Sequence, residues 1–296
     1  MKIAACAYPL DFLPNWTAYA AKLTDWVSRA ADQGADLLVF PEYGAMELAS
    51  LGGADVAADL EAALVEVMRQ SDAVHELHCA LAAQHKLHIL GASGPAMAPH
   101  AARPVNRATL YGPNGVIGHQ DKQIMTRFER EDWDIAPGHG LQVFDTALGK
   151  IGVIICYDAE FPLLARALVD AGAEILLAPS CTETLAGYTR VKVGAMARAL
   201  ENQCITVHAP TVGAADWCPA VDANTGAAAI YGPPDLGFPE TGILAQTDLN
   251  QPGWAMADIS LDAISRVRRE GAVLNHAHWC EQEKRTTAPV TRINGA

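Results

Sequence analysis

Segments with the patterns of strands and helices alternate along most of this chain, and this alternation restricts the folds open to it. Short apolar runs such as 36–40 and 151–155 are typical of strands that are buried on both faces. Stretches such as 15–33, with apolar side chains at helical spacing, lie between them. Pairs of predicted helices between pairs of predicted strands occur twice, which predicts an α/β fold of two similar halves packed as layers.

The predicted elements begin and end at glycine, proline and capping residues. We expect strands at 2–8, 36–40, 88–91, 108–111, 116–121, 142–145, 151–156, 174–178, 204–207, 226–231 and 254–259. We expect helices at 15–33, 54–70, 71–85, 162–171 and 187–201, with Ser71 as an N-cap. The run 112–115 predicts a hairpin turn, 226–231 is expected to pair with 254–259, and 232–242 is expected to be a loop.

The chain is long enough for one large α/β domain. Of its 296 residues 50% are hydrophobic, which provides material for a sizeable core. No linker divides the sequence, and clear periodicity ends near Gly271. We therefore expect one domain over residues 1–270 and a C-terminal tail over 271–296.

Charge and cysteine usage argue against several classes of partner. The 34 acidic and 21 basic residues give a net charge of −13, which disfavours nucleic acid and anionic membranes. No apolar run approaches the roughly 20 residues of a membrane helix, and the N-terminus lacks the pattern of a signal peptide. The seven cysteines show no paired spacing, which favours reduced thiols and a cytoplasmic location.

Three reactive side chains stand at the C-terminal ends of predicted strands. Glu42 and Lys122 each follow a strand, and Cys156 ends one before the break at Phe161-Pro162. Ligands of open α/β sheets bind at this edge, so we expect the three side chains to meet there.

A thiol that attacks a carbonyl carbon needs a base and a donor-rich pocket for the oxyanion. Glu42 can be the base if burial raises its pKa. Lys122 can stabilise the oxyanion and help to lower the pKa of the thiol, and the backbone N–H of Tyr157 is a natural second donor. The three residue types therefore predict nucleophilic catalysis by Cys156.

The segments around these residues resemble a known family. Leu38-Val39-Phe40-Pro41-Glu42, Asp121-Lys122 and the run 152–162 resemble, in that order, the signature segments of the nitrilase superfamily of carbon–nitrogen hydrolases. The resemblance covers residues 1–262. It implies an α-β-β-α sandwich, a Glu-Lys-Cys triad without metal or organic cofactor, and a small-molecule substrate. It also implies a homodimer or larger homo-oligomer, formed through 162–171 and 187–201.

The resemblance further implies a second carboxylate that holds Lys122 and the substrate. Glu129, Glu131 and Asp132 compete for this role. We expect Glu131, because its distances along the chain from Lys122 and from Pro137-Gly138 look like those of family amidases, and Glu129 is the second choice.

The pair Tyr157-Asp158 resembles the amidase branches of the family, so we expect hydrolysis of a linear amide to an acid and ammonia or an amine. Nitriles and N-carbamoyl compounds are alternatives with the same triad. An acyltransferase and a non-catalytic scaffold of the same fold are alternatives of another class.

Loops at the same edge of the sheet are expected to line the substrate pocket. The candidates are Tyr43, Trp133, Cys181, Thr182, Glu183 and Tyr188. Cys181 is expected to be a wall residue and not a second nucleophile, and Glu183 would favour a cationic group. His276, His278 and Cys280 alternate as ligands on a strand can, but we interpret them as a chance pattern in the tail.

Overall fold

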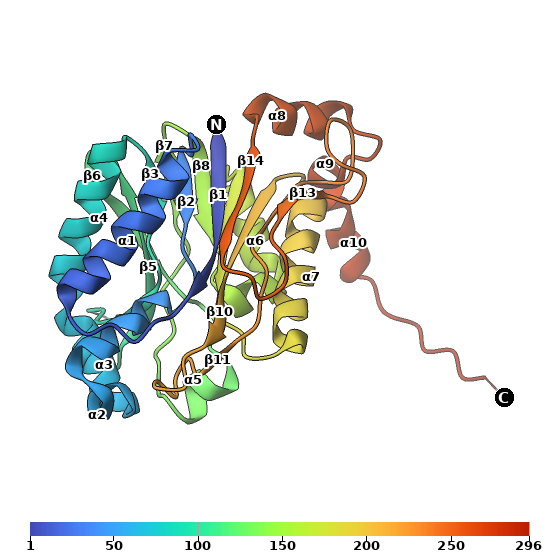
Figure 1. The fold of residues 1–296 in the computed structure, drawn as a ribbon. Coiled ribbons are helices and arrows are strands. Elements are labelled where there is room, and N and C mark those ends of the chain that lie inside the picture. Colours follow the sequence, from blue (N-terminus) through green and yellow to red (C-terminus); the bar gives the residue numbers. More distant parts are fainter. Residues whose placement is uncertain (100, 296) are drawn as a thin grey trace.

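The computed structural model describes residues 1–99 and 101–295, and it confirms the mixed α/β fold (Figure 1). The strands are β1 (Lys2–Pro9), β2 (Leu37–Val39), β3 (His88–Leu90), β4 (Gly94–Ala96), β5 (Val105–Gly112), β6 (Gly115–Asp121), β7 (Val143–Thr146), β8 (Gly149–Val153), β9 (Ile175–Ser180), β10 (Ile205–Ala214), β11 (Ala223–Asn224), β12 (Ala229–Tyr231), β13 (Ile243–Gln246) and β14 (Gly253–Asp258). They form a curled sheet with the central order β4-β5-β3-β2-β1-β10-β9-β8-β7.

Helices cover both sides of the strands. The α-helices are α1 (Trp16–Ala31), α2 (Ala54–Ala57), α3 (Leu60–Arg69), α4 (Ser71–His85), α5 (Arg127–Glu131), α6 (Pro162–Asp170), α7 (Leu185–Asn202), α8 (Leu261–Glu270), α9 (Asn275–His278) and α10 (Glu283–Thr286). The 3-10 helices are η1 (Gly44–Gly52), η2 (Cys156–Glu160) and η3 (Trp279–Gln282). Figure 1 shows α1 and α4 on one side of the strands and α6 and α7 on the other.

The two halves join where the C-terminal ends of β1 and β10 pair in parallel, at Tyr8↔Thr211 and Pro9↔Val212. Alternate residues of β1 face different layers. Ile3 and Ala5 belong to a core that includes residues of β8, β9 and β10, whereas Ala4 and Cys6 belong to a core that includes residues of α1, α3 and α4. These strands are therefore apolar on both faces because each face is covered.

Several predicted elements need correction. The predicted helix 54–70 is two helices, because the side chain of Asp59 caps a new start by accepting from Ala62 N. Ser71 is not an N-cap: Gln70 occupies that position and makes no side-chain cap bond. The helix α8, capped by Ser260, was not predicted.

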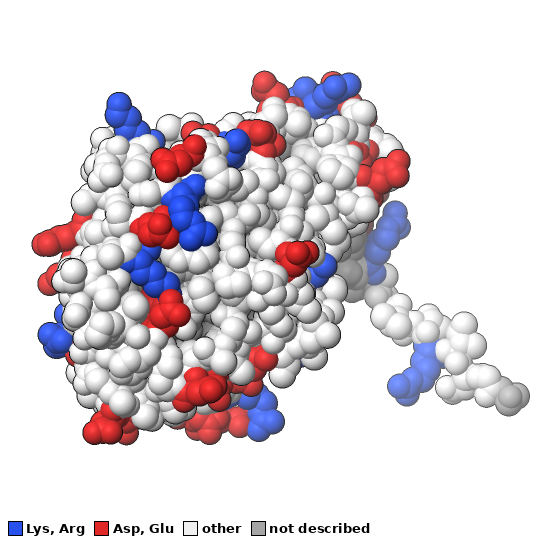
Figure 2. All heavy atoms as spheres, viewed as in Figure 1, with Lys and Arg blue, Asp and Glu red and all other residues white. Residues whose placement is uncertain are grey.

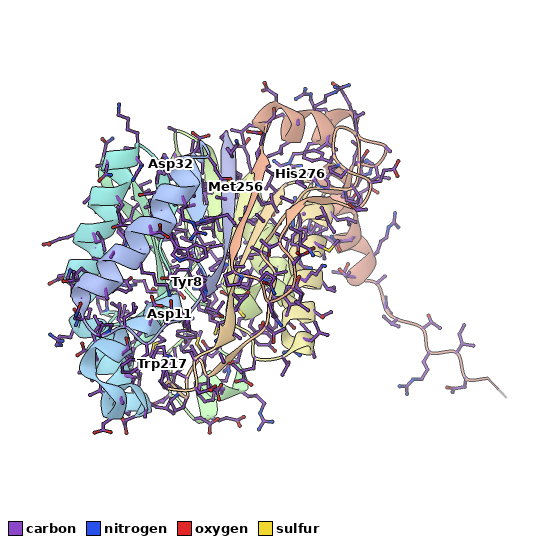
Figure 3. The ribbon with its side chains drawn as sticks, in the orientation of Figure 1. Tyr8, Asp11, Asp32, Trp217, Met256 and His276 are labelled. Carbon is purple, nitrogen blue, oxygen red and sulfur yellow. The ribbon has the colours of Figure 1, made fainter. Side chains whose placement is uncertain are left out.

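The predicted pairing of 226–231 with 254–259 is wrong. β12 pairs with β10 and with β13, a short strand that follows the loop 232–242 and was not predicted. β14 instead runs antiparallel to β1, from Lys2↔Asp258 to Ala7↔Gly253. Figure 3 shows Met256 of β14 beside β1.

A buried carboxylate ties the segment after β1 to η1. Glu47 accepts hydrogen bonds from the Tyr8 hydroxyl at 3.0 Å and from Asp11 N at 2.7 Å, and it also pairs with Lys22. Tyr8 and Asp11 lie close together in Figure 3.

The last residues leave the body of the protein, as Figure 1 shows for the segment after α10. Asp235 accepts from Ala272 N and Val273 N and so fixes the start of the tail. On the face shown in Figure 2, acidic and basic side chains are interspersed. None of the helices in residues 1–99 and 101–295 is long and apolar enough to span a membrane.

Candidate active site

The structure brings Glu42, Lys122 and Cys156 together in one cavity of about 530 Å³. The three residues follow β2, β6 and β8, so the strand ends lie at a shared edge as expected. Of the expected wall residues, five line this cavity: Tyr43, Trp133, Cys181, Thr182 and Glu183. The side chain of Glu183 is exposed, so it lies at the mouth of the cavity.

Tyr188 does not line the cavity, contrary to expectation. It is buried in α7 and stacks on His208, with ring centroids 5.7 Å apart. Three charged residues that were not predicted, Arg127, Glu160 and Arg190, do line the cavity, and Glu160 and Arg190 pair with each other at 3.4 Å.

Lys122 is held between two carboxylates. Its Nζ lies 2.8 Å from Glu42 Oε1 and 2.6 Å from Glu129 Oε2, and the residue is 1% exposed. Burial by itself would lower the pKa of Lys122, but the charges of Glu129 and Glu42 outweigh it and hold the pKa well above its usual value. Lys122 is therefore a fixed positive charge at neutral pH.

The carboxylate that holds Lys122 from the second side is Glu129, which corrects the expectation of Glu131. Glu129 is 2% exposed and accepts from Tyr43 OH at 2.7 Å and from both N and Oγ1 of Thr126 at 2.8 Å. Burial opposes the charge of Glu129, but Lys122 holds its pKa below the usual value.

Glu131 lies on the surface, where it pairs with Arg127 at 2.7 Å. Two helical residues that are two positions apart point about 200° away from each other, so only one of the two glutamates can face Lys122. A local signal could have identified Glu129. Thr126 and Glu129 form a capping box, in which the third residue of the helix folds back toward the N-cap.

Glu42 is a buried base with a full set of donors. Its Oε1 accepts from Lys122 and from Asn106 Nδ2 at 3.0 Å, and its Oε2 accepts from Cys181 N at 2.9 Å. Burial raises the pKa of Glu42, and the charge of Lys122 opposes this shift without cancelling it. Asn106 was missed in the sequence, because β5 begins at Val105 whereas the predicted strand began at residue 108.

Cys156 begins η2, shortly after the end of β8 at Val153, and has a φ of +50°. Few residues other than glycine adopt this left-handed conformation, which is typical of sharp strand-to-helix turns that present a nucleophile. The thiol donates a hydrogen bond to Cys181 O at 3.8 Å, and it lies near enough to Glu42 for each group to shift the pKa of the other. Tyr157 follows at the start of the turn and lines the cavity.

Burial raises the pKa of the Cys156 thiol well above its usual value, and the charge of Glu42 adds to the shift. Lys122 acts in the opposite direction and lowers the pKa of the thiol, as expected, but its charge does not outweigh burial and Glu42 in this resting state. The resting pair is therefore a neutral thiol beside a carboxylate, and proton transfer has to accompany the attack of the sulfur.

Asp158 fastens the loop that carries Lys122 to the turn that carries Cys156. Its carboxylate accepts from the backbone N–H groups of Gln123, Ile124 and Ile155 at distances from 2.8 to 3.2 Å. Burial raises the pKa of Asp158 to about 6. One side chain thus fixes the relative position of the nucleophile and the cation.

Aromatic rings form one wall of the cavity. Trp133 packs against Tyr43 and Phe128, with centroid distances of 4.8 and 5.7 Å. The thiol of Cys181 is engaged with Asn224 Oδ1 at 3.3 Å, and burial raises its pKa. Cys181 therefore has the features of a wall residue.

In the parts of the chain that the structure describes, no group of three or more His, Cys, Asp or Glu side chains could hold a metal ion. His276 and His278 are in the short helix α9, and Cys280 is an exposed residue of η3. This part of the tail is helical, so the three residues do not alternate along a strand.

Comparisons with known proteins identify the family of this chain. Residues 2–269 match the family described as carbon-nitrogen hydrolase. A protein of Bacillus subtilis named "Probable hydrolase YhcX" is 32% identical over 278 residues, which are 92% of this chain but 52% of that protein. The chain thus spans about half the length of this relative.

A deaminated glutathione amidase of Synechocystis is 26% identical over 92% of this chain and 97% of its own length. The crystal structure of Saccharomyces cerevisiae Nit3, a member of the nitrilase superfamily, superposes with a TM-score of 0.70 at 21% identity, covering 91% of this chain and 93% of Nit3. The family match over nearly the whole chain leads to one conclusion: this chain belongs to the carbon–nitrogen hydrolase family.

Proposed function

We propose that this protein hydrolyses a small-molecule amide through a thioester on Cys156. The observation that carries the proposal is the meeting of Cys156, Glu42 and Lys122 in one cavity of about 530 Å³, where Lys122 donates to the carboxylate of Glu42 at 2.8 Å. A cavity of this size suits a small molecule. The deaminated glutathione amidase among the relatives supports an amide as the substrate.

In the first step Glu42 takes the proton of the thiol while the sulfur attacks the carbonyl carbon of the amide. The carbonyl oxygen becomes an oxyanion, which Lys122 Nζ and the backbone N–H of Tyr157 stabilise. The tetrahedral intermediate then collapses. The C–N bond breaks, the protonated Glu42 gives its proton to the departing nitrogen, and a thioester remains.

In the second half Glu42 removes a proton from water, and the resulting hydroxide attacks the thioester carbon. The same two donors stabilise the second oxyanion. The C–S bond breaks, the thiol regains a proton from Glu42, and the carboxylic acid leaves. Glu129, with Tyr43 and Thr126 as its partners, keeps Lys122 in position throughout.

The test measures ammonia release from a panel of linear amides, ω-amides, N-carbamoyl compounds and nitriles. Cys156→Ala is expected to reduce turnover on the order of 10⁴-fold or more. Cys204→Ala is the matched control, because Cys204 is also buried but lies outside the cavity, and it should retain turnover. Undiminished turnover by Cys156→Ala would refute the proposal.

Rapid quenching followed by mass spectrometry tests the intermediate directly. An acyl adduct on the peptide that contains Cys156 is expected with an amide substrate. Turnover of nitriles but not of amides would reassign the substrate class. Formation of an N-acyl product when an amine is added, in place of the acid, would indicate an acyltransferase.

The expected association of identical copies stays a prediction. Exposed apolar side chains on α6 and α7 support it, since Leu163 is 73% exposed and Val193 is 60% exposed. Light scattering tests it, and a monomer at micromolar concentration would contradict it.

A further inference from the structure

We propose that Asn106 is a positioning residue that orients Glu42 and sets its proton affinity, and that Ser93 holds Asn106 in the required orientation. The inference rests on the proposed role of Glu42 as the base. Asn106 lies in β5 and is fully buried. Its Nδ2 donates to Glu42 Oε1 at 3.0 Å, and its main-chain oxygen accepts from Lys122 N at 2.9 Å. One residue thus contacts both the base and the backbone of the lysine.

The orientation of the Asn106 side-chain amide follows from its hydrogen bond with Ser93. A backbone N–H can only donate, so the N–H of Tyr43 donates to Ser93 Oγ, at 3.1 Å. The Ser93 hydroxyl is then free to donate its own hydrogen to Asn106 Oδ1, at 2.6 Å. The Oδ1 atom therefore faces Ser93, and the Nδ2 donor faces Glu42.

Ser93 also holds the turn that presents Glu42. Its N–H donates to Pro41 O at 3.0 Å, and its carbonyl accepts from Ala45 N at 3.3 Å. Tyr43, inside this turn, has a φ of +52°, a conformation that the surrounding structure has to maintain. The hydrogen bonds therefore run from the backbone beside Glu42, through Ser93 and Asn106, back to the carboxylate of Glu42.

This closed arrangement has two chemical consequences. Asn106 is a neutral donor whose hydrogen bond favours the carboxylate form of Glu42, so it counteracts part of the effect of burial on the pKa of this group. Glu42 Oε1 already accepts from two donors, whereas Oε2 accepts only from Cys181 N, so Oε2 is the oxygen with a lone pair left for the proton of the thiol. Asn106 therefore selects the oxygen that carries the proton.

The test uses iodoacetamide, so it does not depend on knowing the substrate. The rate of alkylation of Cys156, followed on its peptide by mass spectrometry, is measured across pH. The alkylation rate should fall as the pH decreases through the pKa of Glu42, and this fall is the acid limb of the profile. The acid limb should disappear in Glu42→Gln, which assigns it to Glu42. A limb that persists in Glu42→Gln would overturn the role of Glu42, and with it the proposed mechanism, independently of Asn106.

Asn106→Ala removes a donor to the charged form of Glu42, so the pKa of Glu42 rises and the acid limb moves to higher pH. A shift of about one pH unit is expected from a hydrogen bond to a charged group. Ser93→Ala should shift the limb in the same direction by a smaller amount. The double variant should match Asn106→Ala alone, because both residues act through one hydrogen bond.

Asn202→Ala is the matched control. Asn202 is equally buried, but its Nδ2 donates to Arg198 O in α7, outside the cavity. It should lose stability without moving the limb. Coincident limbs for wild type and folded Asn106→Ala would overturn the proposal. If Asn106→Ala does not fold, the shift of the acid limb in Ser93→Ala tests the proposal, because this variant keeps Asn106 in place. No shift in Ser93→Ala would then overturn it.

Discussion

Replacing Glu129 by glutamine is the sharpest test of the charge arrangement around Lys122. The substitution keeps the shape of the side chain, and the new amide oxygen can still accept from Lys122 and Thr126 while the amide nitrogen donates to the Tyr43 hydroxyl. It removes one of the two negative charges within 3 Å of Lys122 Nζ, which stand at 2.6 and 2.8 Å. What is lost is therefore the charge and not the packing.

The expected loss follows from the burial of the cluster. At an effective dielectric constant of about 20, two unit charges about 2.6 Å apart attract each other by roughly 6 kcal/mol, which is an upper bound. Breaking a buried pair by removing one partner destabilises proteins by about 3–5 kcal/mol. Because Lys122 keeps Glu42 as a partner, we expect about 3 kcal/mol for Glu129→Gln. Amide turnover should fall about 10²-fold as Lys122 loses its fixed position.

The assay pairs urea unfolding with amide turnover for Glu129→Gln and Glu131→Gln. Glu131 is exposed, its side chain being 53% accessible, and exposed ion pairs contribute little to stability, so its variant should match wild type in both measurements. Equal losses in the two variants, or no loss in Glu129→Gln, would refute the assignment of Glu129 as the partner of Lys122.

Three further changes have defined outcomes. Burial raises the pKa of Glu42, and only its carboxylate form can take a proton. The value of kcat/KM should therefore fall as the pH decreases, with a midpoint above the ordinary glutamate pKa of about 4.3. A midpoint at or below that value contradicts this prediction. Cys181→Ala should keep turnover within about threefold, because Cys181 contacts Glu42 through its backbone N–H, and a loss nearer 10²-fold would show that its thiol is needed. Asp158→Asn turns an amide nitrogen toward backbone donors and should lower the free energy of unfolding by about 2–3 kcal/mol in urea titrations; unchanged stability would contradict this.

The positions of most strands and of three reactive residues could be predicted because their signals are local, whereas the short strands β4, β11 and β13 were missed. The apolar stripe of the predicted helix 15–33 contains the buried residues of α1, and Glu42, Lys122 and Cys156 follow strands whose ends share one edge. The pairing of β14 with β1 joins residues about 250 positions apart, and no local pattern carries that information.

The choice between Glu129 and Glu131 failed for a different reason. Spacing along the chain does not say which face of a short helix points inward, and a shift of two residues reverses the face. The capping box formed with Thr126 fixes that face, and it is visible in the sequence. Asn106 could not be assigned a role from the sequence, because its function depends on a serine that reaches it from a neighbouring strand connection.

The left-handed backbone at Cys156 bears on what the chain has been selected for. Glycine adopts a φ of +50° without the clash of a Cβ atom, and any other residue there costs about 1–2 kcal/mol. A chain maintained only as a scaffold would gain stability from a single change to glycine at this position. The fold alone therefore disfavours cysteine at position 156. Related sequences that have lost catalysis but keep the fold are expected to replace this cysteine by glycine.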